Sequence, residues 1–231
     1  MRYSALINGS PSPRKNDTPG GEFSFKIVYY GPALSGKTTN LAYIHSRIAP
    51  NHRGDLITLA TAADRTLFFD YLPLSASILP GYQTKFQLYT VPGQVLYDST
   101  RQLVLRGVDG VVFVADSQWE KAAEAVESFQ NLQQNLARQN RNITEIPYVL
   151  TYNKRDLGDI APVSYLEYLL NNQKRRVRSF ETIARTGFNV FVALDAVTQV
   201  LLHHFTAGNP RGPFEPKPDR PGSVPSGDTK A

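Results

Sequence analysis

Apolar residues gather along the chain in short runs bounded by polar and turn-forming residues, and stretches with apolar positions three or four residues apart separate these runs. Short apolar runs are typical of strands, whereas the wider spacing is typical of amphipathic helices. The expected strands are residues 25–30, 68–72, 84–91, 111–115, 147–152 and 180–184. The expected helices are residues 38–48, 122–136 and 191–201. Their alternation predicts an α/β fold with a mainly parallel six-stranded sheet and helices on both faces.

The two ends of the chain lack this pattern. Residues 1–22 are rich in Ser, Pro, Asn and Gly, and the last residues carry prolines among glycines and charges. Such compositions cannot bury a core. We therefore expect a flexible N-terminal arm over residues 1–22, one folded domain over 23–206 and a disordered Pro/Gly-rich tail over 207–231.

Composition excludes several classes of protein. The chain has 231 residues, 41% of them hydrophobic, which suits one domain with a sizeable core. Its net charge of +5 is a mild, dispersed bias that does not indicate nucleic-acid binding. The absence of cysteine excludes disulfides, zinc–thiolate sites and thiol catalysis.

The chain carries no signal for export or membrane insertion. Its polar start lacks a secretory segment, and no uninterrupted apolar run approaches the roughly 18 residues of a membrane span. We expect a cytoplasmic protein with no integral membrane segment. The basic residues between 174 and 178 indicate a solvated loop or, as the alternative, a weak contact with an anionic surface or acidic partner.

A phosphate-binding loop follows the first expected strand. The segment Gly31-Pro32-Ala33-Leu34-Ser35-Gly36-Lys37-Thr38 fits the pattern G-x-x-x-x-G-K-[ST], and a helix follows it as the motif requires. The loop amides and the helix N-terminus can bind phosphates, Lys37 can neutralise their oxygens, and the Thr38 hydroxyl can ligate Mg²⁺. The residues assigned to the phosphates are Gly31, Leu34, Ser35, Gly36, Lys37, Thr38 and Thr39.

A second motif selects the base. Asn153, Lys154 and Asp156 form N-K-x-D directly after the strand at 147–152. A carboxylate at Asp156 can accept hydrogen bonds from two guanine N–H groups that adenine does not present together. Lys154 would lie along the base, and Asn153 would join this loop to the phosphate loop. After the weak strand at 180–184, the amide of Ala184 is a candidate donor to the guanine O6.

A third group of residues suits phosphate chemistry. Gly93 and Gln94 follow the strand at 84–91, where Gly93 can offer its amide to a γ-phosphate and Gln94 can orient an attacking water. All these groups follow predicted strands, and parallel strands bring their carboxyl ends to one edge of a sheet, where α/β folds bind ligands. The sequence therefore predicts a site for GTP or GDP with Mg²⁺.

With these residues assembled, the chain resembles the bacterial Ras-like GTPases of gliding motility and cell polarity, the mutual gliding-motility protein A family. The resemblance implies a P-loop NTPase fold of the small-GTPase type over residues 23–206. The stretches that carry it are residues 26–40 (KIVYYGPALSGKTTN), 65–74 (RTLFFDYLPL), 86–95 (FQLYTVPGQV), 105–117 (LRGVDGVVFVADS) and 152–157 (YNKRDL).

The resemblance also implies residue roles and a partner. Ras-like proteins usually have D-x-x-G where this chain has Thr90 at the first position, and the gliding-motility family shows the same replacement. The resemblance assigns Arg65 as an arginine finger supplied in cis and Thr66 as the switch threonine that senses Mg²⁺ and γ-phosphate. Asp70 is a candidate for the carboxylate that Thr90 lacks. A small roadblock-domain protein that accelerates hydrolysis is the implied partner.

One departure keeps two functions open. The family, like Ras, usually has glycine at the third loop position, where this chain has Ala33, whose methyl can crowd the transition state. A GTP-hydrolysing switch for polarity or motility is favoured by Arg65 and Gln94. A GTP-binding scaffold that hydrolyses little and is controlled by nucleotide exchange is favoured by Ala33 and Thr90. A third interpretation, an ATP-dependent kinase or motor, would require the match of Asp156 to the N-K-x-D motif to be a chance one.

Overall fold

The computed structural model describes residues 21–59, 69–76, 78, 83–94, 97–173 and 176–208. Arg65 and Thr66 lie outside the described residues, as do the basic residues Lys174 and Arg175. The domain boundaries expected from composition stay a prediction.

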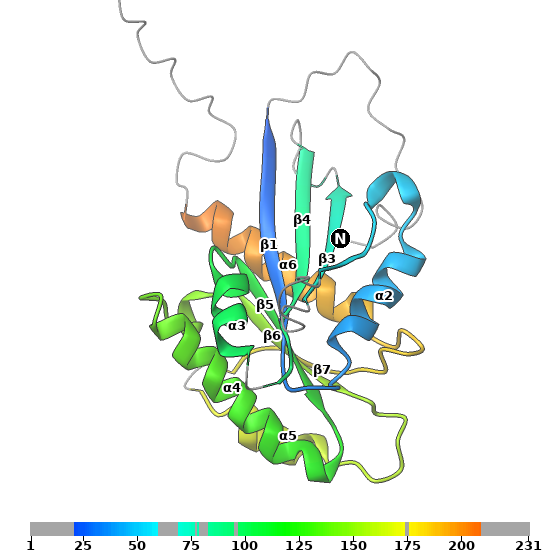
Figure 1. Ribbon diagram of the computed structural model, residues 1–231, viewed down its shortest axis with the longest axis vertical. Helices are drawn as coiled ribbons and strands as arrows, with labels where there is room; N and C mark the ends of the chain where they lie inside the picture. Colours follow the sequence, from blue (N-terminus) through cyan, green and yellow to red (C-terminus); the bar gives the residue numbers. More distant parts are fainter. Residues whose placement is uncertain are drawn as a thin grey trace, which may run out of the picture.

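A seven-stranded sheet forms the centre of the molecule, in the order β2-β3-β4-β1-β5-β6-β7 (Figure 1). The strands are β1 (Glu22–Tyr30), β2 (Ile57–Leu59), β3 (Phe69–Ala76), β4 (Gln83–Thr90), β5 (Gly110–Asp116), β6 (Tyr148–Asn153) and β7 (Ser179–Glu181). β3 runs antiparallel to both β2 and β4, whereas β4, β1, β5, β6 and β7 pair in parallel. The predicted α/β fold with a mainly parallel sheet is confirmed.

The prediction of six strands is wrong, because β2 adds an antiparallel edge strand beside β3. This strand has only three residues, Ile57–Leu59, too few for an alternating apolar pattern to stand out. β3 runs to Ala76, beyond the predicted end at residue 72, although Pro73 inside it has no N–H for the ladder. β7 is shorter than predicted and ends at Glu181.

Helices cover both faces of the sheet, as predicted (Figure 1). They are α2 (Lys37–Arg47), α3 (Asp98–Leu105), α4 (Ala122–Ala137), α5 (Val163–Leu170) and α6 (Val190–Gly208). Short 3-10 turns occupy η1 (Pro50–His52), η3 (Trp119–Lys121) and η4 (Ile143–Glu145). Neither α3 nor α5 was predicted, because each has eight residues and its apolar positions cover only about two turns.

Two cores lie on the two faces of the sheet. Ile27 and Tyr29 of β1 belong to a core with side chains of α2 and α6, and Val28 and Tyr30 belong to another with side chains of α3, α4 and α5. β5 and β6 are buried along their whole length, which explains their nearly continuous apolar sequences.

Within the described residues, α6 is the one helix whose length and apolar composition would suit a membrane span. One face of it packs into the core through Val190, Leu194, Val197 and Leu201, which recur at steps of three and four residues. His203 and His204 are exposed. We therefore interpret α6 as an amphipathic core helix. It ends at Gly208, beyond the predicted last position at residue 201.

We predict that a chain trimmed to residues 21–208 unfolds within about 2–4 °C of the full chain, the change that about 1 kcal/mol produces in a domain of this size. The reason is that both cores are built from residues inside that range. Thermal unfolding followed by circular dichroism measures the difference.

The control is Phe205→Ala, which removes ring contacts with Phe23 at 5.2 Å and with Phe25 at 5.3 Å. This substitution should lower the free energy of unfolding by about 1–3 kcal/mol in both the full and the trimmed chain. A large loss of stability on trimming alone would mean that one end of the chain packs on the domain.

Candidate functional site

The parallel sheet brings four loops to its carboxyl-end edge. The register aligns Tyr29 of β1 with Thr90 of β4, and Asp116 of β5 with Asn153 of β6. The loops after β1, β4, β6 and β7 therefore emerge beside one another. These are the loops that carry the phosphate motif, Gly93 and Gln94, the N-K-x-D motif, and Ala184.

The phosphate loop depends on glycine at two positions. Gly31 has φ +148° and Gly36 has φ +102°, values that side chains rarely adopt. A Cβ on Gly31 would lie 2.2 Å from the Val114 carbonyl oxygen, and one on Gly36 would lie 2.1 Å from Nδ2 of Asn153. Leu34 at the loop apex is left-handed without being glycine, with φ 60° and its side chain exposed. The backbone of the loop is therefore tightly folded, and Gly31 and Gly36 have no side chain of their own to cover its amides.

Lys37 places a buried ammonium beside this loop. Its Nζ donates to the carbonyl oxygens of Gly31 at 3.0 Å and Pro32 at 2.6 Å. Burial, followed by the charge of Arg101, lowers the pKa of Lys37 to about 7, and Asp70 offsets part of this shift. An anion in the loop would stabilise the ammonium, so the lysine suits a ligand with several negative charges.

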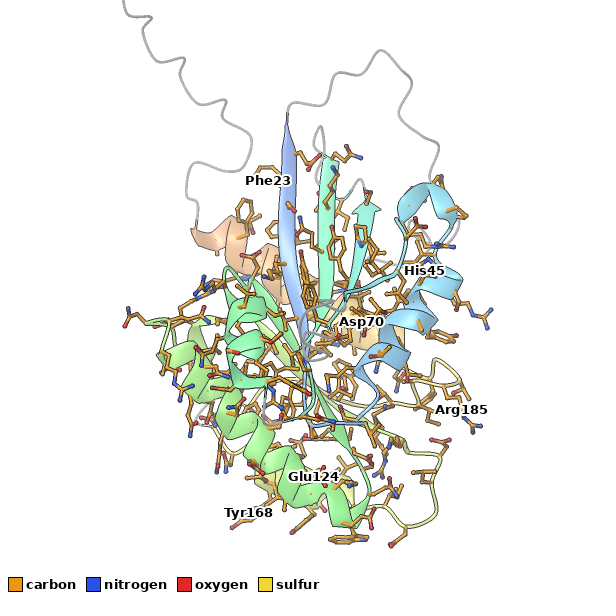
Figure 2. The ribbon with its side chains drawn as sticks, in the orientation of Figure 1. Phe23, His45, Asp70, Glu124, Tyr168 and Arg185 are labelled. Carbon is orange, nitrogen blue, oxygen red and sulfur yellow. The ribbon has the colours of Figure 1, made fainter. Side chains whose placement is uncertain are left out.

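A cluster of hydroxyls surrounds one buried carboxylate beside Lys37; we call Thr38, Thr58, Asp70 and Thr90 the Asp70 cluster. Asp70 Oδ2 accepts from the Thr38 hydroxyl at 2.6 Å and from the Thr90 hydroxyl at 2.9 Å. Asp70 Oδ1 accepts from the Thr58 hydroxyl at 2.9 Å, and the Asp70 amide donates to Thr90 Oγ1. Figure 2 shows Asp70 where β3 approaches α2. Sequence reasoning missed Thr58, because its strand was not predicted.

The Asp70 cluster supplies the kind of ligands that Mg²⁺ prefers. A small hard cation takes oxygen ligands and is usually bound by one or two carboxylates together with waters and substrate phosphates. Among the described residues no group of three His, Asp or Glu side chains could hold a metal ion. One carboxylate with a threonine hydroxyl, next to a phosphate loop, therefore fits Mg²⁺ bound jointly with a nucleotide.

A cavity of about 530 Å³ joins these groups to the loop after β4. It is lined by Lys37, Thr38, Asp70 and Gln94, among others. Gly93 lies so close to the phosphate loop that a Cβ on it would stand 2.2 Å from Cα of Ala33. The departure from the family pattern at Ala33 is therefore located at the contact between the phosphate loop and the segment that carries Gln94.

Asn153 joins the base side of the site to the phosphate side. Its Nδ2 donates to the Ser35 carbonyl at 2.7 Å, and its Oδ1 accepts from the Ala184 amide at 2.9 Å and from Thr182 Oγ1 at 3.3 Å. The Ala184 amide thus donates to Asn153 in this structure. Its expected contact with the guanine O6 stays a prediction.

The other two residues of the motif have charged partners. Lys154, with φ 67°, places Nζ 2.6 Å from Oδ2 of Asp116, a buried carboxylate at the end of β5. Asp156 Oδ2 accepts from Nη2 of Arg185 at 3.1 Å, and Arg185 is largely exposed (Figure 2). Sequence reasoning missed Asp116, although its position at the end of a buried strand was a usable signal.

The sequence is similar to that of proteins of the Ras family. The model of the Ras family matches residues 59–203. The chain is 51% identical over 187 residues to the mutual gliding-motility protein MglA of Myxococcus xanthus (strain DK1622), covering 81% of this chain and 95% of that protein. It is 26% identical over 202 residues to the human Ras-related protein Rab-4A, covering 87% and 83%. It is 23% identical over 190 residues to the Ras-related protein rab-39 of Caenorhabditis elegans, covering 82% and 78%.

We predict that Asn153→Ala lowers the free energy of unfolding by about 1–3 kcal/mol, because it leaves the Ser35 carbonyl and the Ala184 amide buried without their partner. It should also speed release of bound GDP by about tenfold, the effect of about 1.4 kcal/mol. Chemical denaturation and the dissociation of a fluorescent GDP analogue measure the two effects.

Asn171→Ala is the matched control. Asn171, directly after α5, is also buried, and its side chain forms hydrogen bonds with both the amide and the carbonyl of Val177. Its loss should destabilise the fold without changing GDP release. Equal acceleration in both variants would mean that Asn153 acts on the fold as a whole and not on the site.

Proposed function

The chain belongs to the Ras family, and on that premise we propose that it is a GTP-binding molecular switch that regulates gliding motility and cell polarity. It is a small GTPase that binds guanine nucleotides and hydrolyses GTP to GDP, as proteins of this family do. The motility role is supported by 51% identity over most of the chain to the Myxococcus gliding-motility protein. The observation that carries the proposed site is the Asn153 side chain, which joins the phosphate loop to the base-side loop.

The proposed nucleotide contacts come from both halves of this site. The amides from Leu34 to Thr39 and the ammonium of Lys37 bind the phosphates, with the glycines at 31 and 36 keeping the backbone open to them. Asp156 accepts the guanine N–H donors, and Lys154 lies along the base while Asp116 holds its ammonium. A base that lacks those donors forgoes the two hydrogen bonds to the Asp156 carboxylate, which disfavours its binding.

The proposed Mg²⁺ ligands are the Thr38 hydroxyl and Thr66, with Asp70 acting through a bound water. Thr66 comes from a part of the chain outside the described residues. The Asp70 carboxylate already contacts both Thr38 and Thr90, so it occupies the region where other Ras-like proteins have the D-x-x-G aspartate. When bound, Mg²⁺ supplies positive charge to the β- and γ-phosphate oxygens.

The proposed hydrolysis uses Gln94 and Arg65. Gln94 orients a water that attacks the γ-phosphorus, the bond from that phosphorus to the β–γ bridging oxygen breaks, and GDP and phosphate leave. Gly93 offers its amide to the γ-phosphate. Arg65, assigned by resemblance and outside the described residues, neutralises charge that develops in the transition state. The scaffold alternative is not favoured, because Ras-family proteins hydrolyse GTP.

Membership of the Ras family also indicates how the activity of this chain is regulated. Small GTPases act with regulators and effectors. We propose a roadblock-domain protein as the activating regulator and the cytoplasm as the compartment. Both proposals rest on the family resemblance of the sequence.

We predict that Gln94→Leu and Arg65→Ala each slow single-turnover GTP hydrolysis while GTP affinity stays nearly unchanged, because both groups act on the transition state. Arginine fingers are worth about 10³–10⁵ in rate. The measurement is phosphate release from GTP-loaded protein, with and without a roadblock-domain protein from the same genome. Ala33→Gly should speed hydrolysis by removing the methyl next to Gly93.

Gln199→Leu, at an exposed position of α6, is the control and should leave the rate unchanged. Wild-type protein without turnover under any partner condition would favour the scaffold instead of the switch.

We predict that Asp70→Asn raises the Mg²⁺ concentration needed to slow GDP release by about 10–100-fold, the usual cost of losing an outer ligand of a metal site. The amide keeps the size of the side chain and removes its charge. GDP dissociation measured across a Mg²⁺ titration, with a chelator as the end point, gives the shift. Asp109→Asn is the control, since this part-buried carboxyl lies directly before the start of β5 and accepts from the Lys26 amide in the middle of β1. An unchanged Mg²⁺ response in folded Asp70→Asn would remove Asp70 from the metal site.

A further inference from the structure

Arg101 of α3 is one of the largest fully buried side chains of the described part, and its guanidinium binds the loop that carries Gln94. Nε donates to the Pro92 carbonyl at 2.9 Å, and Nη2 donates to the Gly93 carbonyl at 2.6 Å. Two N–H groups of one rigid, planar fork thus hold two successive carbonyls. The orientation of both peptide groups is set by this one side chain.

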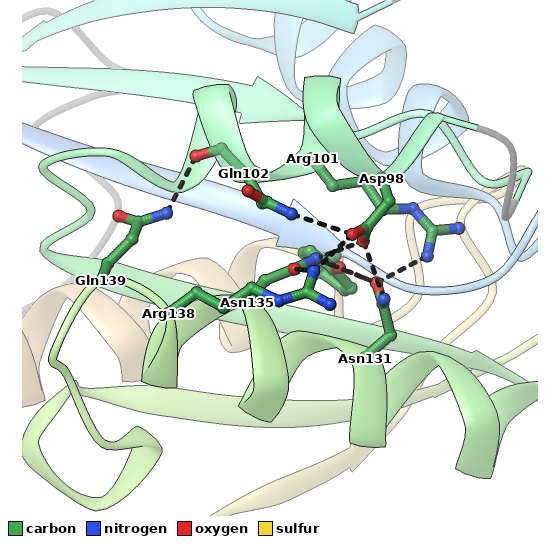
Figure 3. A network of polar contacts seen from close by, with 8 residues as sticks. Asp98, Arg101, Gln102, Asn131, Asn135, Arg138 and Gln139 are labelled. Atoms are coloured by element: carbon green, nitrogen blue, oxygen red, sulfur yellow. Dashed lines mark hydrogen bonds and ion pairs between the residues drawn. The ribbon is translucent and has the colours of Figure 1, made fainter.

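The third contact of Arg101 connects it to α4 (Figure 3). Nη1 donates to Oδ1 of Asn131 at 2.8 Å, and Asn131 donates from Nδ2 to Oδ1 of Asp98, also at 2.8 Å. The side-chain amide of Asn131 therefore bridges the guanidinium of Arg101 and the carboxylate of Asp98 by hydrogen bonds. The Asn131 oxygen also accepts from the Tyr30 hydroxyl, at the last residue before the phosphate loop. We call Arg101 and Asn131 the clamp.

Asp98 fixes α3 on α4 independently of the clamp. Its carboxylate also accepts from Asn135 at 2.8 Å, from Gln102 at 2.9 Å and from Arg138 at 2.6 Å. Burial raises the pKa of this carboxyl, but the hydrogen bonds that it accepts outweigh burial and hold its pKa well below the usual range. The helix that carries Arg101 is thus anchored on α4.

The segment from Pro92 to Gln94 is not packed against α4 itself. A cavity of about 600 Å³ lies there, lined by Gly93, Gln94 and Arg101 and by side chains of α4. The Arg101 hydrogen bonds cross from α3 to this segment, and Arg101 also lines the cavity. In a trans peptide the carbonyl and the next N–H point in opposite directions. Holding both carbonyls toward Arg101 therefore turns the amides of Gly93 and Gln94 away from it.

We propose that Arg101 is a positioning residue for GTP hydrolysis, which sets the orientation of the Gly93 amide and the place of Gln94 through the carbonyls of Pro92 and Gly93. The inference rests on the proposed function, in which Gln94 orients the attacking water. A misplacement of about 1 Å can cost about 10²-fold in rate. Arg101 thus acts on catalysis without touching the nucleotide.

The test uses Arg101→Lys, which keeps the charge and loses the fork. Single-turnover GTP hydrolysis by the full chain should slow by about 10–100-fold, with GDP dissociation nearly unchanged. In the Gln94→Leu background the same substitution should cause no further loss, because residues that act as a unit are not additive. An equal loss in both backgrounds would overturn the proposal, since Arg101 would then act only on the fold. Gln94→Leu without any effect would overturn the role of Gln94 and, with it, this inference.

A matched pair of variants tests the clamp should Arg101→Lys fail to fold. Asn131 of α4 and Arg138 directly after α4 both donate to Asp98, at 2.8 and 2.6 Å, but of the two only Asn131 contacts Arg101 in the described structure. Asn131→Ala should slow hydrolysis several-fold, whereas Arg138→Met should lower the melting temperature without changing the rate. Equal slowing in both would attribute the effect to loosening of α3 and α4 and would contradict the proposal.

Discussion

Parallel pairing of β1 with β4 and β5 is the constraint on which the rest of the molecule depends. It is stabilised by burial on both faces, because alternate side chains of β1 enter the two opposite cores. With these strands in register, and with β6 and β7 continuing the parallel pairing, the loops that follow β1, β4, β6 and β7 meet at one edge and carry most groups of the site. The antiparallel strands β3 and β2 extend the same sheet and contribute Asp70 and Thr58 from the side.

Asp70 of β3 places its carboxylate beside Thr90 on the neighbouring strand β4. Thr90, at the end of β4, is hydrogen-bonded to Asp70 of the neighbouring strand. In the proposed metal site, Asp70 supplies the carboxylate that Ras-like proteins usually have at the position of Thr90. The two residues lie one position beyond the pair Tyr71 and Tyr89 in the antiparallel register, so their side chains share a face. Side chains paired across strands are close enough for one to replace the other at a ligand.

The sequence was sufficient for features that depend on local pattern and insufficient for those that depend on distant contacts. The buried central strands and the motif residues from 31 to 38 and from 153 to 156 are visible because each is continuous along the chain. β2, α3 and α5 were missed because short elements show little periodicity. Arg101 resembles any arginine on a helix until the fold shows it buried against two carbonyls contributed by the preceding loop. The hydrogen bond from the Ala184 amide to Asn153 could not be predicted from sequence, because the two residues are distant along the chain.

The Asn153 side chain gives the site a thermodynamic property that neither motif has alone. One amide group bonds to the backbone of the phosphate loop and to the backbone of the base-side loop, so ordering either loop reduces the entropy cost of ordering the other. In the proposed site, a guanosine that orders the base-side loop would therefore favour binding of pyrophosphate at the phosphate loop, and the reverse, without the two ligands touching each other. The intact nucleotide would gain this coupling in addition to the sum of its contacts.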